Sequence, residues 1–444
     1  MTLLIISPDY ASHLYPLATL GAPWRDAGER VVVASGPATA SIVEEFGFER
    51  VDLRLGRGSN PGVIRAEEQP RGEDDALRGF FDATRVGMVE TLAFQAQARR
   101  NDLLWNPLEI ARNVLRVVDE VAPTEIIVDH LAFSARLALV SAGIAHADVV
   151  LGHPATLPVA GEVYGYPPAW PAAFAPSVRE LDELRALCER VRDDFTSEWN
   201  TALLELDPDA TPSRDAFAET GDVLLLNYPE ELHDTARARA LPAHAFLGSA
   251  VRAEPVDHEV QEWLAADDAP LVYVSFGSFL SVRGDVLARV VAGLREVTDA
   301  SGRPVRVALA SGSTDPSELG EIPDGWLVRE FLPQVVLLSH AVAAVSHGGN
   351  NSVTEAMTSG VPLLVLPFST DQFAGAASLE HAGFAESSDP NTVTPSDVRD
   401  AVSRLVRLPA GARSRLDSLA HSLTNTTGAS RAFTALRAPA GIVS

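Results

Sequence analysis

The chain has 444 residues, 46% of them hydrophobic and 21% charged, which predicts a globular protein of two or three domains with a sizeable core. Its formal net charge of −25 argues against nucleic acid or an anionic membrane surface as the main partner, because both need a basic face. The sequence contains no lysine, so its 35 basic residues are all arginine, which excludes a phosphate loop ending in Gly-Lys-Ser/Thr and a lysine Schiff base.

In the N-terminal half, short apolar runs alternate with amphipathic segments, as in a parallel sheet with helices on both faces. The first run is too short for a secretion signal, and the single cysteine, Cys188, fits a reducing compartment, so we expect a cytoplasmic protein without stable membrane insertion. The expected strands are Leu3–Ile6, Val31–Ala34, Arg50–Leu53, Glu125–Val128 and, last in this half, Val223–Asn227. The expected helical segments are Tyr15–Asp26, Ala38–Phe46, residues 76–121 and a helix from about Ala132, with a surface loop over residues 54–75 and an irregular pocket wall over residues 155–180.

Residues 247–257 resemble a linker, because the α/β pattern restarts after them. We therefore expect an N-terminal domain over residues 1–246 and a second domain over residues 258–420. In the second domain the expected strands are Leu271–Ser275, Val305–Ala310, Trp326–Glu330, Val342–Val345 and Leu363–Leu366, and the expected helices are Val286–Thr298, Asn351–Thr358 and a stretch over about 410–437. Two doubly wound domains would face each other across a cleft and bind ligands at the carboxyl ends of their strands.

The densest chemical signal is Ser-His-Gly-Gly-Asn-Asn-Ser at residues 346–352, between an expected strand and an expected helix. The glycines let the backbone approach a ligand closely, and the helix start offers unpaired N–H groups to an anion. His347 and Ser352 can add side-chain donors to a diphosphate, and the carboxylate of Glu355, one turn later, suits two ribose hydroxyls. The alternative is a glycine turn before an N-capped helix with no ligand.

The surrounding residues favour the ligand site. Phe-Leu-Pro-Gln at 331–334 precedes the segment, and Gly-Val-Pro at 360–362, Pro367 and Asp371-Gln372 follow it. In this order and spacing they resemble the donor-binding signature of family-1 glycosyltransferases of the GT-B fold, which include plant secondary-product, animal glucuronosyl and bacterial macrolide or natural-product enzymes. The resemblance implies two Rossmann-like domains and a C-terminal helix, within residues 421–444, that crosses back to the N-terminal domain.

The resemblance also implies a role for each donor-side residue. Phe331 would stack on the nucleobase where the family usually has Trp, Leu332 would present its backbone to the base edge, and Gln334 would contact base or ribose. The diphosphate would be held by His347, Asn351 and Ser352, approached closely at Gly349, and touched by a second loop at Gly277 and Ser278. Glu355 would bind the ribose, Asp371 and Gln372 would hold hydroxyls of the transferred sugar, and Asn350 stands where plant members carry Trp.

The second half of such a reaction needs a base for the acceptor hydroxyl. His13 follows the first expected strand and Asp129 ends another, so both should lie at the same sheet edge. A histidine oriented by a carboxylate is suited to this proton transfer. The bland alternatives are a surface or capping histidine and a helix-capping aspartate, and Asp9 is an alternative partner. The context of His13 also resembles the family's Gly-His-x-x-Pro segment, with Ser12 replacing Gly.

These observations predict inverting, metal-independent transfer of a hexose, with UDP-glucose as the expected donor, to a hydroxyl of a phenolic, flavonoid, polyketide or macrolide acceptor. No His, Asp or Glu grouping has metal-site spacing. The alternatives are a dTDP-deoxysugar donor, a sugar-nucleotide 2-epimerase and an inactive helper protein, and the chain would act as a monomer or homodimer. Candidate acceptor-pocket residues, several of which could be core, are Phe80, Phe81, Phe94, Trp105, His130, Phe133, Tyr164 and Trp170.

Overall fold

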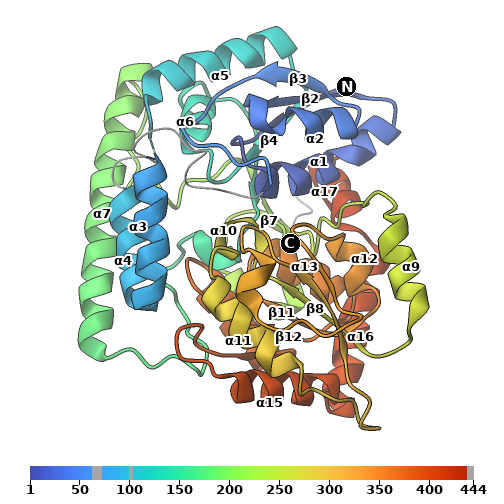
Figure 1. Cartoon of the computed structure of the whole chain (residues 1–444). Helices are drawn as coiled ribbons and strands as arrows, with labels where there is room; N and C mark the ends of the chain where they lie inside the picture. Colours follow the sequence, from blue (N-terminus) through green and yellow to red (C-terminus); the bar gives the residue numbers. More distant parts are fainter. Residues whose placement is uncertain (63–72, 100–103, 438–444) are drawn as a thin grey trace.

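The computed structural model describes residues 1–62, 73–99 and 104–437, which form two parallel β-sheets wrapped by helices (Figure 1). The first sheet has the strand order β3-β2-β1-β4-β5-β6-β7 and the second β10-β9-β8-β11-β12-β13. The first sheet comprises β1 (Thr2–Ile6), β2 (Arg30–Ser35), β3 (Glu49–Asp52), β4 (Glu125–Asp129), β5 (Ala147–Val150), β6 (Val223–Leu226) and β7 (His244–Phe246). The second comprises β8 (Leu271–Ser275), β9 (Arg306–Ala310), β10 (Leu327–Arg329), β11 (Ala341–Ser346), β12 (Leu363–Val365) and β13 (Ala385–Ser387).

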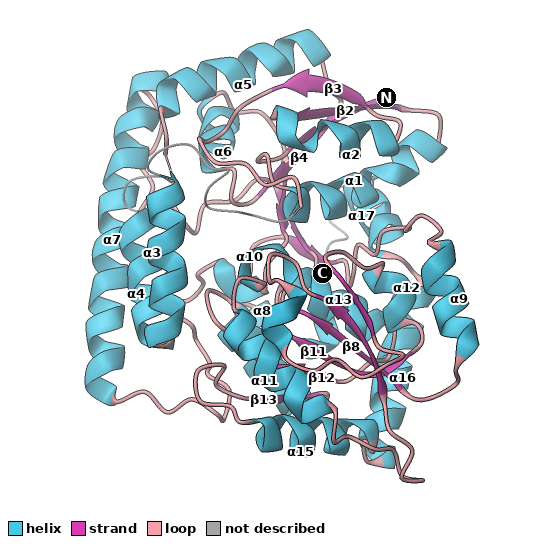
Figure 2. Cartoon of the chain, viewed as in Figure 1, coloured by secondary structure: helices cyan, strands magenta, loops and turns pink. Residues whose placement is uncertain are grey.

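Helices cover both faces of each sheet (Figure 2). Around the first sheet lie α1 (Ala11–Asp26), α2 (Ala40–Glu45), α5 (Pro107–Val121), α6 (Phe133–Ser141), α7 (Val178–Leu206) and α8 (Thr235–Ala238). The helices α3 (Glu73–Val86) and α4 (Met88–Arg99) pair beside α7, where Phe80 of α3 packs on the core of the second domain. The rest of the chain carries α9 (His258–Ala266), α10 (Gly277–Leu280), α11 (Gly284–Leu294), α12 (Gln334–Leu338), α13 (Asn350–Thr358), α14 (Gln372–Ala382), α15 (Pro395–Val406), α16 (Ala410–Asn425) and α17 (Gly428–Arg437).

The apolar runs form strands because both of their faces are buried. Leu3 and Ile5 of β1 pack in one hydrophobic cluster with α1, whereas Leu4 and Ile6 pack in another with α5. Successive side chains of a strand point to opposite faces, so a run without polar residues needs helices on both sides. The second sheet repeats this arrangement with its own pair of clusters. The two doubly wound α/β domains predicted from the alternating pattern are therefore confirmed.

The C-terminal end of the described chain returns to the first domain. α16 packs in the cluster that contains residues of α13, but the helix breaks at residues 426–427 and α17 then lies against α1. There the rings of Trp24 and Phe433 meet edge to face, with their centroids 4.8 Å apart. The predicted helix that crosses back to the first domain is therefore confirmed. The prediction of one helical stretch over residues 410–437 is wrong, because α16 packs on the second domain and a separate helix, α17, packs on the first.

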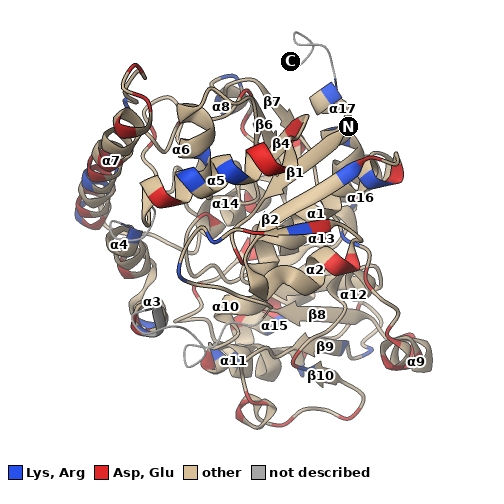
Figure 3. Cartoon of the chain, turned by 90° about the horizontal axis from the view of Figure 1, so that it is seen from above, with Lys and Arg blue, Asp and Glu red and all other residues tan. Residues whose placement is uncertain are grey.

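Two further differences concern the first domain. Val223–Asn227 is not its last strand, because β7 pairs in parallel with β6 at the sheet edge. The long helix α7, which runs along one side of the molecule, was not among the predicted elements. Its outer side carries basic and acidic residues in close succession (Figure 3), including an ion pair between Arg185 and Glu189 at 3.1 Å.

Candidate active site

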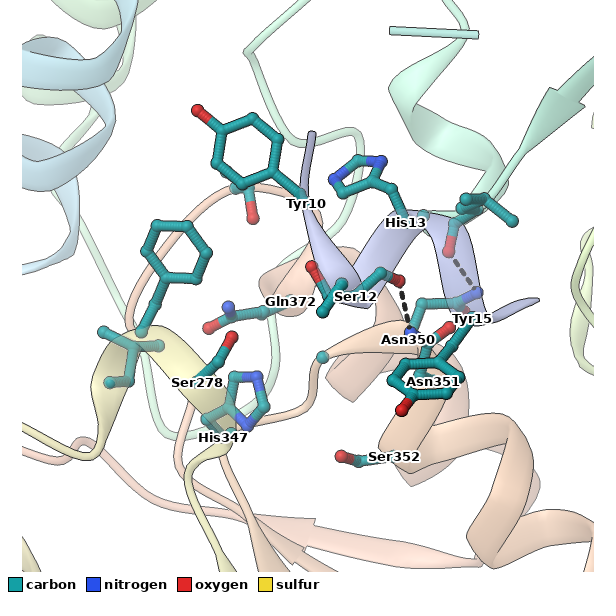
Figure 4. Close-up of a pocket in the computed structure, with 18 of the residues that line it drawn as sticks. Tyr10, Ser12, His13, Tyr15, Ser278, His347, Asn350, Asn351, Ser352 and Gln372 are labelled. Atoms are coloured by element: carbon teal, nitrogen blue, oxygen red, sulfur yellow. Dashed lines mark hydrogen bonds between the residues drawn. The ribbon is translucent and has the colours of Figure 1, made fainter. Parts of the chain in front are cut away.

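The structure contains a cavity of about 1340 Å³ lined by residues of both domains. Its wall includes the start of α1, the loops that follow β4, β5 and β8, and the start of α13, so it lies where the carboxyl ends of the two parallel sheets face each other. Residues 252–258, which connect the domains, line it as well. Figure 4 shows part of this wall.

His13 and Asp129 are brought together at this edge. His13 lies in the first turn of α1, and Asp129 is the buried last residue of β4. Nδ1 of His13 lies 2.7 Å from Oδ2 of Asp129, while Oδ1 of Asp129 accepts a hydrogen bond from the backbone N–H of Leu131 at 2.8 Å. A carboxylate held in this way keeps the proton of a neutral imidazole on Nδ1 and leaves the Nε2 lone pair free to accept a proton.

Burial and charge act on His13 in opposite directions. Burial, the largest single influence, lowers the pKa of His13, but the charge of Asp129, the hydrogen bond to it and the charge of Asp371 outweigh burial, so the pKa is raised above 6.5. The imidazolium form is thus stabilised where the imidazole would gain a proton. Asp9 has a different function, since its carboxylate accepts hydrogen bonds from the backbone N–H groups of Ala38 and Thr39 at 3.1 and 3.0 Å. Asp9 is therefore not the partner of His13.

On the opposite wall, His347 is packed between Gly349, at the start of α13, and Gly277, at the start of α10. A Cβ atom at Gly349 would lie 2.3 Å from Nε2 of His347, and one at Gly277 would lie 2.8 Å from its Cε1, so only glycine leaves room for the ring at either position. Burial lowers the pKa of His347 to about 4, against a smaller opposing effect of the Ser275 backbone, so the ring is neutral at pH 7. No side chain caps α13, whose first N–H groups are left to another acceptor.

A hydrogen-bonded group lies next to this helix start. Nε2 of Gln334 donates to the buried carboxylate of Glu355 and to Oγ of Ser352, and the Tyr273 hydroxyl donates to Oε1 of Gln334 at 3.3 Å. Burial is the main reason that the pKa of Glu355 is raised, and the nearby Arg252 guanidinium opposes it from 4.0 Å. Arg252 could not be predicted from the sequence, because a lone arginine in a linker-like stretch carries no motif.

Phe331, Leu332 and Ser278 complete the donor-side wall. Phe331 is 59% exposed, so one face of its ring is open to the cavity. Oγ of Ser278 accepts a hydrogen bond from the Asn60 side chain of the first domain at 3.3 Å.

Four residues expected at the donor line the cavity, and their side chains also have protein partners. The side-chain amides of Asn350 and Asn351 donate to backbone carbonyls of the first domain. Asp371 accepts hydrogen bonds from the backbone N–H of His153 and the hydroxyl of Thr370. Gln372 is buried and bonds to its own loop, at Phe368 and Ser369. The spacing of a motif cannot reveal these contacts, because they depend on the facing domain and on loop geometry.

The acceptor-side predictions divide into two groups. Phe80, Phe94, His130 and Tyr164 line the cavity, and burial, as the main cause, lowers the pKa of His130 and keeps it neutral. The other four predicted residues, Phe81, Phe133, Trp105 and Trp170, do not line it. Phe81 and Phe133 are buried in the core, Trp105 packs beneath the first sheet, and Trp170 packs on Phe373. Aromatic rings of the wall that were not predicted from the sequence are Tyr10, Tyr15, Tyr166, Tyr273 and Phe279.

The described part of the chain shows neither a metal-binding group nor a membrane-spanning helix. No three His, Cys, Asp or Glu side chains within residues 1–62, 73–99 and 104–437 are grouped so that they could hold a metal ion. None of the helices described is both long enough and apolar enough to span a bilayer.

Comparisons with known proteins agree with this geometry. A family model described as "UDP-glucoronosyl and UDP-glucosyl transferase" matches residues 195–419, just over half of the chain. Over 173 residues, the chain is 31% identical to the NDP-glycosyltransferase YjiC of Bacillus subtilis, a match that covers 39% of this chain and 42% of that protein. The chain thus spans less than half the length of the curated relatives that it matches.

The solved structures match along almost the whole chain. The glycosyltransferase VinC in complex with dTDP has a TM-score of 0.67 at 18% identity, and the match covers 98% of this chain and 99% of VinC. The kitacinnamycin glycosyltransferase has a TM-score of 0.64 at 23% identity, covering 97% of this chain and 96% of that one. At these identities the likeness concerns the fold, and it confirms the two-domain GT-B architecture predicted from the signature.

Proposed function

Because the chain belongs to the UDP-glucoronosyl and UDP-glucosyl transferase family, we propose that it transfers a hexose from a nucleotide diphosphate to a hydroxyl of a small hydrophobic acceptor. The observation that carries this proposal is the pair formed by His13 and Asp129, held 2.7 Å apart in the same cavity as the uncapped start of α13. A base and an anion site that face one space are the two elements that group transfer to a hydroxyl requires.

In the proposed reaction, Nε2 of His13 accepts the proton of the acceptor hydroxyl as its oxygen attacks the anomeric carbon. The bond between that carbon and the phosphate oxygen breaks, its electron pair leaves with the nucleoside diphosphate, and the single displacement inverts the carbon. Asp129 stabilises the imidazolium that forms. The backbone N–H groups of α13, with Ser352 and Ser278, meet the charge on the leaving diphosphate, so the reaction needs no metal ion and no lysine.

The donor nucleotide would lie along the wall formed by Phe331 and Gln334, behind which the buried Glu355 is hydrogen-bonded to Gln334. The exposed ring of Phe331 offers a surface for a base, and the carboxylate of Glu355 suits ribose hydroxyls. UDP-glucose is the donor proposed first. A dTDP-deoxysugar is the second candidate, favoured because Asp371 and Gln372, the expected ligands of sugar hydroxyls, already bond to protein groups. The dTDP bound to the structural neighbour VinC agrees with that candidate.

The acceptor would lie against the first domain, where Phe80, Phe94 and Tyr164 line the cavity. Aromatic walls with a few polar groups favour flat, apolar ligands, so phenols, flavonoids and polyketides are the proposed class. His130 is the neutral polar group on this side, and it adjoins Asp129.

The test is transfer by the purified protein. UDP-glucose and a set of dTDP-deoxysugars are each incubated with phenols, flavonoids and macrolides, and products are analysed by mass spectrometry for the gain of one sugar. We expect transfer by the wild type and none by His13→Ala, with UDP binding retained by the variant. Transfer that survives His13→Ala would refute the proposed base. An epimerase would instead convert the nucleotide sugar without an acceptor, and a helper protein would bind nucleotide without turnover.

A further inference from the structure

The first two side chains of α13, Asn350 and Asn351, donate hydrogen bonds to backbone carbonyls of the first domain (Figure 4). Nδ2 of Asn351 donates to the carbonyl of Ser12 at 2.9 Å, immediately before His13. Nδ2 of Asn350 donates to the carbonyls of Leu151 and Asn227 at 2.7 and 2.8 Å. Each contact joins the second domain to the edge of the first sheet where the proposed base lies.

The Ser12 carbonyl needs a partner for a reason that is visible in the sequence. In a continuous α-helix this carbonyl would accept a hydrogen bond from the N–H of residue 16, but residue 16 is proline and has no N–H. A partly buried carbonyl left unpaired costs free energy. The amide of Asn351 satisfies it from the other domain, so the helix that carries His13 is tied to α13 where Pro16 interrupts its own bonding.

Asn350 forms a matching link to the other side of the cavity. Leu151 and Asn227 follow β5 and β6, so the two hydrogens of one amide bridge the ends of two adjacent strands. Asp371 adds a third link through the backbone N–H of His153, also in the loop after β5. The amide hydrogens of Asn350 are thereby fully used.

We infer that Asn350 and Asn351 are positioning residues, which hold the domains together so that His13 faces the donor, and that their side chains are not diphosphate ligands. The uncapped backbone N–H groups of α13 remain for the phosphates, because the two amides point away to the first domain. The catalytic part of this inference rests on the proposed function, since it concerns the distance between base and donor.

The expected effect is on turnover rather than on nucleotide binding. A displacement of about 1 Å between reacting groups lowers a rate by roughly 100-fold, whereas loss of a phosphate contact weakens binding of the nucleotide itself. For Asn350→Ala and Asn351→Ala we therefore expect kcat to fall at least about tenfold, while the Kd for UDP changes less than about threefold. The matched control is Asn391→Ala, because Asn391 also donates to a carbonyl of the first domain, Thr84 at 3.0 Å, but lies outside the cavity wall.

The experiment measures four quantities on the full chain: the unfolding midpoint, the Kd for UDP by calorimetry, kcat at saturating donor, and the radius of gyration by X-ray scattering. The inference is supported if Asn350→Ala and Asn351→Ala fold, bind UDP with a nearly unchanged Kd, and show a lower kcat and a larger radius of gyration than the Asn391→Ala control. A Kd weakened tenfold with kcat retained would overturn it in favour of diphosphate ligands, and so would variants that equal the control in kcat and radius.

A second variant tests the proline argument. Pro16→Ala supplies the missing N–H, so Asn351→Ala should destabilise the Pro16→Ala protein less than the wild type; equal destabilisation in both backgrounds would contradict the assignment. Both scattering and unfolding are independent of transfer. If even the wild type transfers no sugar, the proposed function fails while these two measurements still decide whether the asparagines hold the domains together.

Discussion

The imidazole of His13 is partly buried and close to two carboxylates, and the carboxylates have the larger combined effect on its pKa. A base acts in its unprotonated form, so its pKa sets the acidic limit of activity. Because the pKa of His13 is raised above 6.5, kcat/KM should fall as the pH drops through a value above 6.5. A pH–rate profile from pH 5 to 9 checks this, and an acidic limb centred well below 6.5 would contradict it.

Asp129→Asn removes the negative charge of this residue and keeps the shape of its side chain. The variant loses the main influences that raise the pKa of His13, so the acidic limb should move to lower pH. It also loses the carboxylate that fixes the Nδ1–H tautomer and stabilises the imidazolium, so kcat should fall by roughly 10³-fold or more. Comparison of the two pH–rate profiles, with the UDP Kd as a control for donor binding, checks both effects.

At the residue level, sequence reasoning succeeded where chain geometry alone decides the position. His13 and Asp129 could be paired because His13 opens the helix that follows the first strand and Asp129 ends another strand, and the ends of parallel strands share one edge. Asn350 and Asn351 lie at the predicted helix start, but the direction of their amides depends on the Pro16 gap and on the facing domain. The sequence of one local motif shows neither the hydrogen-bonding gap at Pro16 nor the position of the facing domain.

Among the elements, α13 depends on the glycine before it. Gly349 has a φ of −60°, which any residue can adopt, so alanine there tests space and not backbone strain. Its Cβ would lie 2.3 Å from Nε2 of His347 and force the ring from its position between the glycines. We expect Gly349→Ala to remain folded but to weaken UDP binding at least about tenfold, as loss of a charge-assisted contact would.

The matched control is Gly56→Ala, because no atom lies within 4 Å of a Cβ built there. Calorimetry with UDP on both variants, together with their unfolding midpoints, separates an effect on the site from general destabilisation. Unchanged UDP affinity in Gly349→Ala would mean that the nucleotide does not approach this glycine.

The predicted elements were most accurate where the pattern of hydrophobic residues fits only one kind of secondary structure. Leu271–Ser275 is β8 to the residue, because its five residues are all buried and the chain turns on both sides. Helix α7 was missed although Leu184, Cys188, Val191 and Phe195 recur at helical spacing, since dense charges between them obscure the apolar stripe. β7 was missed because three half-buried residues carry too little pattern.

For the whole molecule, α17 is the helix that returns from the second domain to the first. Its Phe433 packs edge to face on Trp24, and Arg437 pairs with Glu29 of the first domain. Phe433→Ala should destabilise the protein by about 2–3 kcal/mol, somewhat less than for a fully buried phenylalanine. Urea unfolding followed by tryptophan fluorescence measures this change.

The matched control for that prediction is Phe331→Ala, because Phe331 is exposed and lies away from α17. It should leave stability within about 0.5 kcal/mol. It should instead weaken nucleotide binding. Equal destabilisation by the two substitutions would show that the contact between α1 and α17 does not support the fold.

The return of α17 also has a consequence for synthesis on the ribosome. All seven strands of the first sheet have been made when residue 246 emerges, yet the side of α1 that Phe433 covers stays bare until the last helix is released. Domains generally fold in order from the N-terminus as they are synthesised. In this protein the first domain is synthesised first, but it lacks its contact with α17 until the second domain has been translated. During that time the exposed apolar strip on α1 must be kept from aggregating.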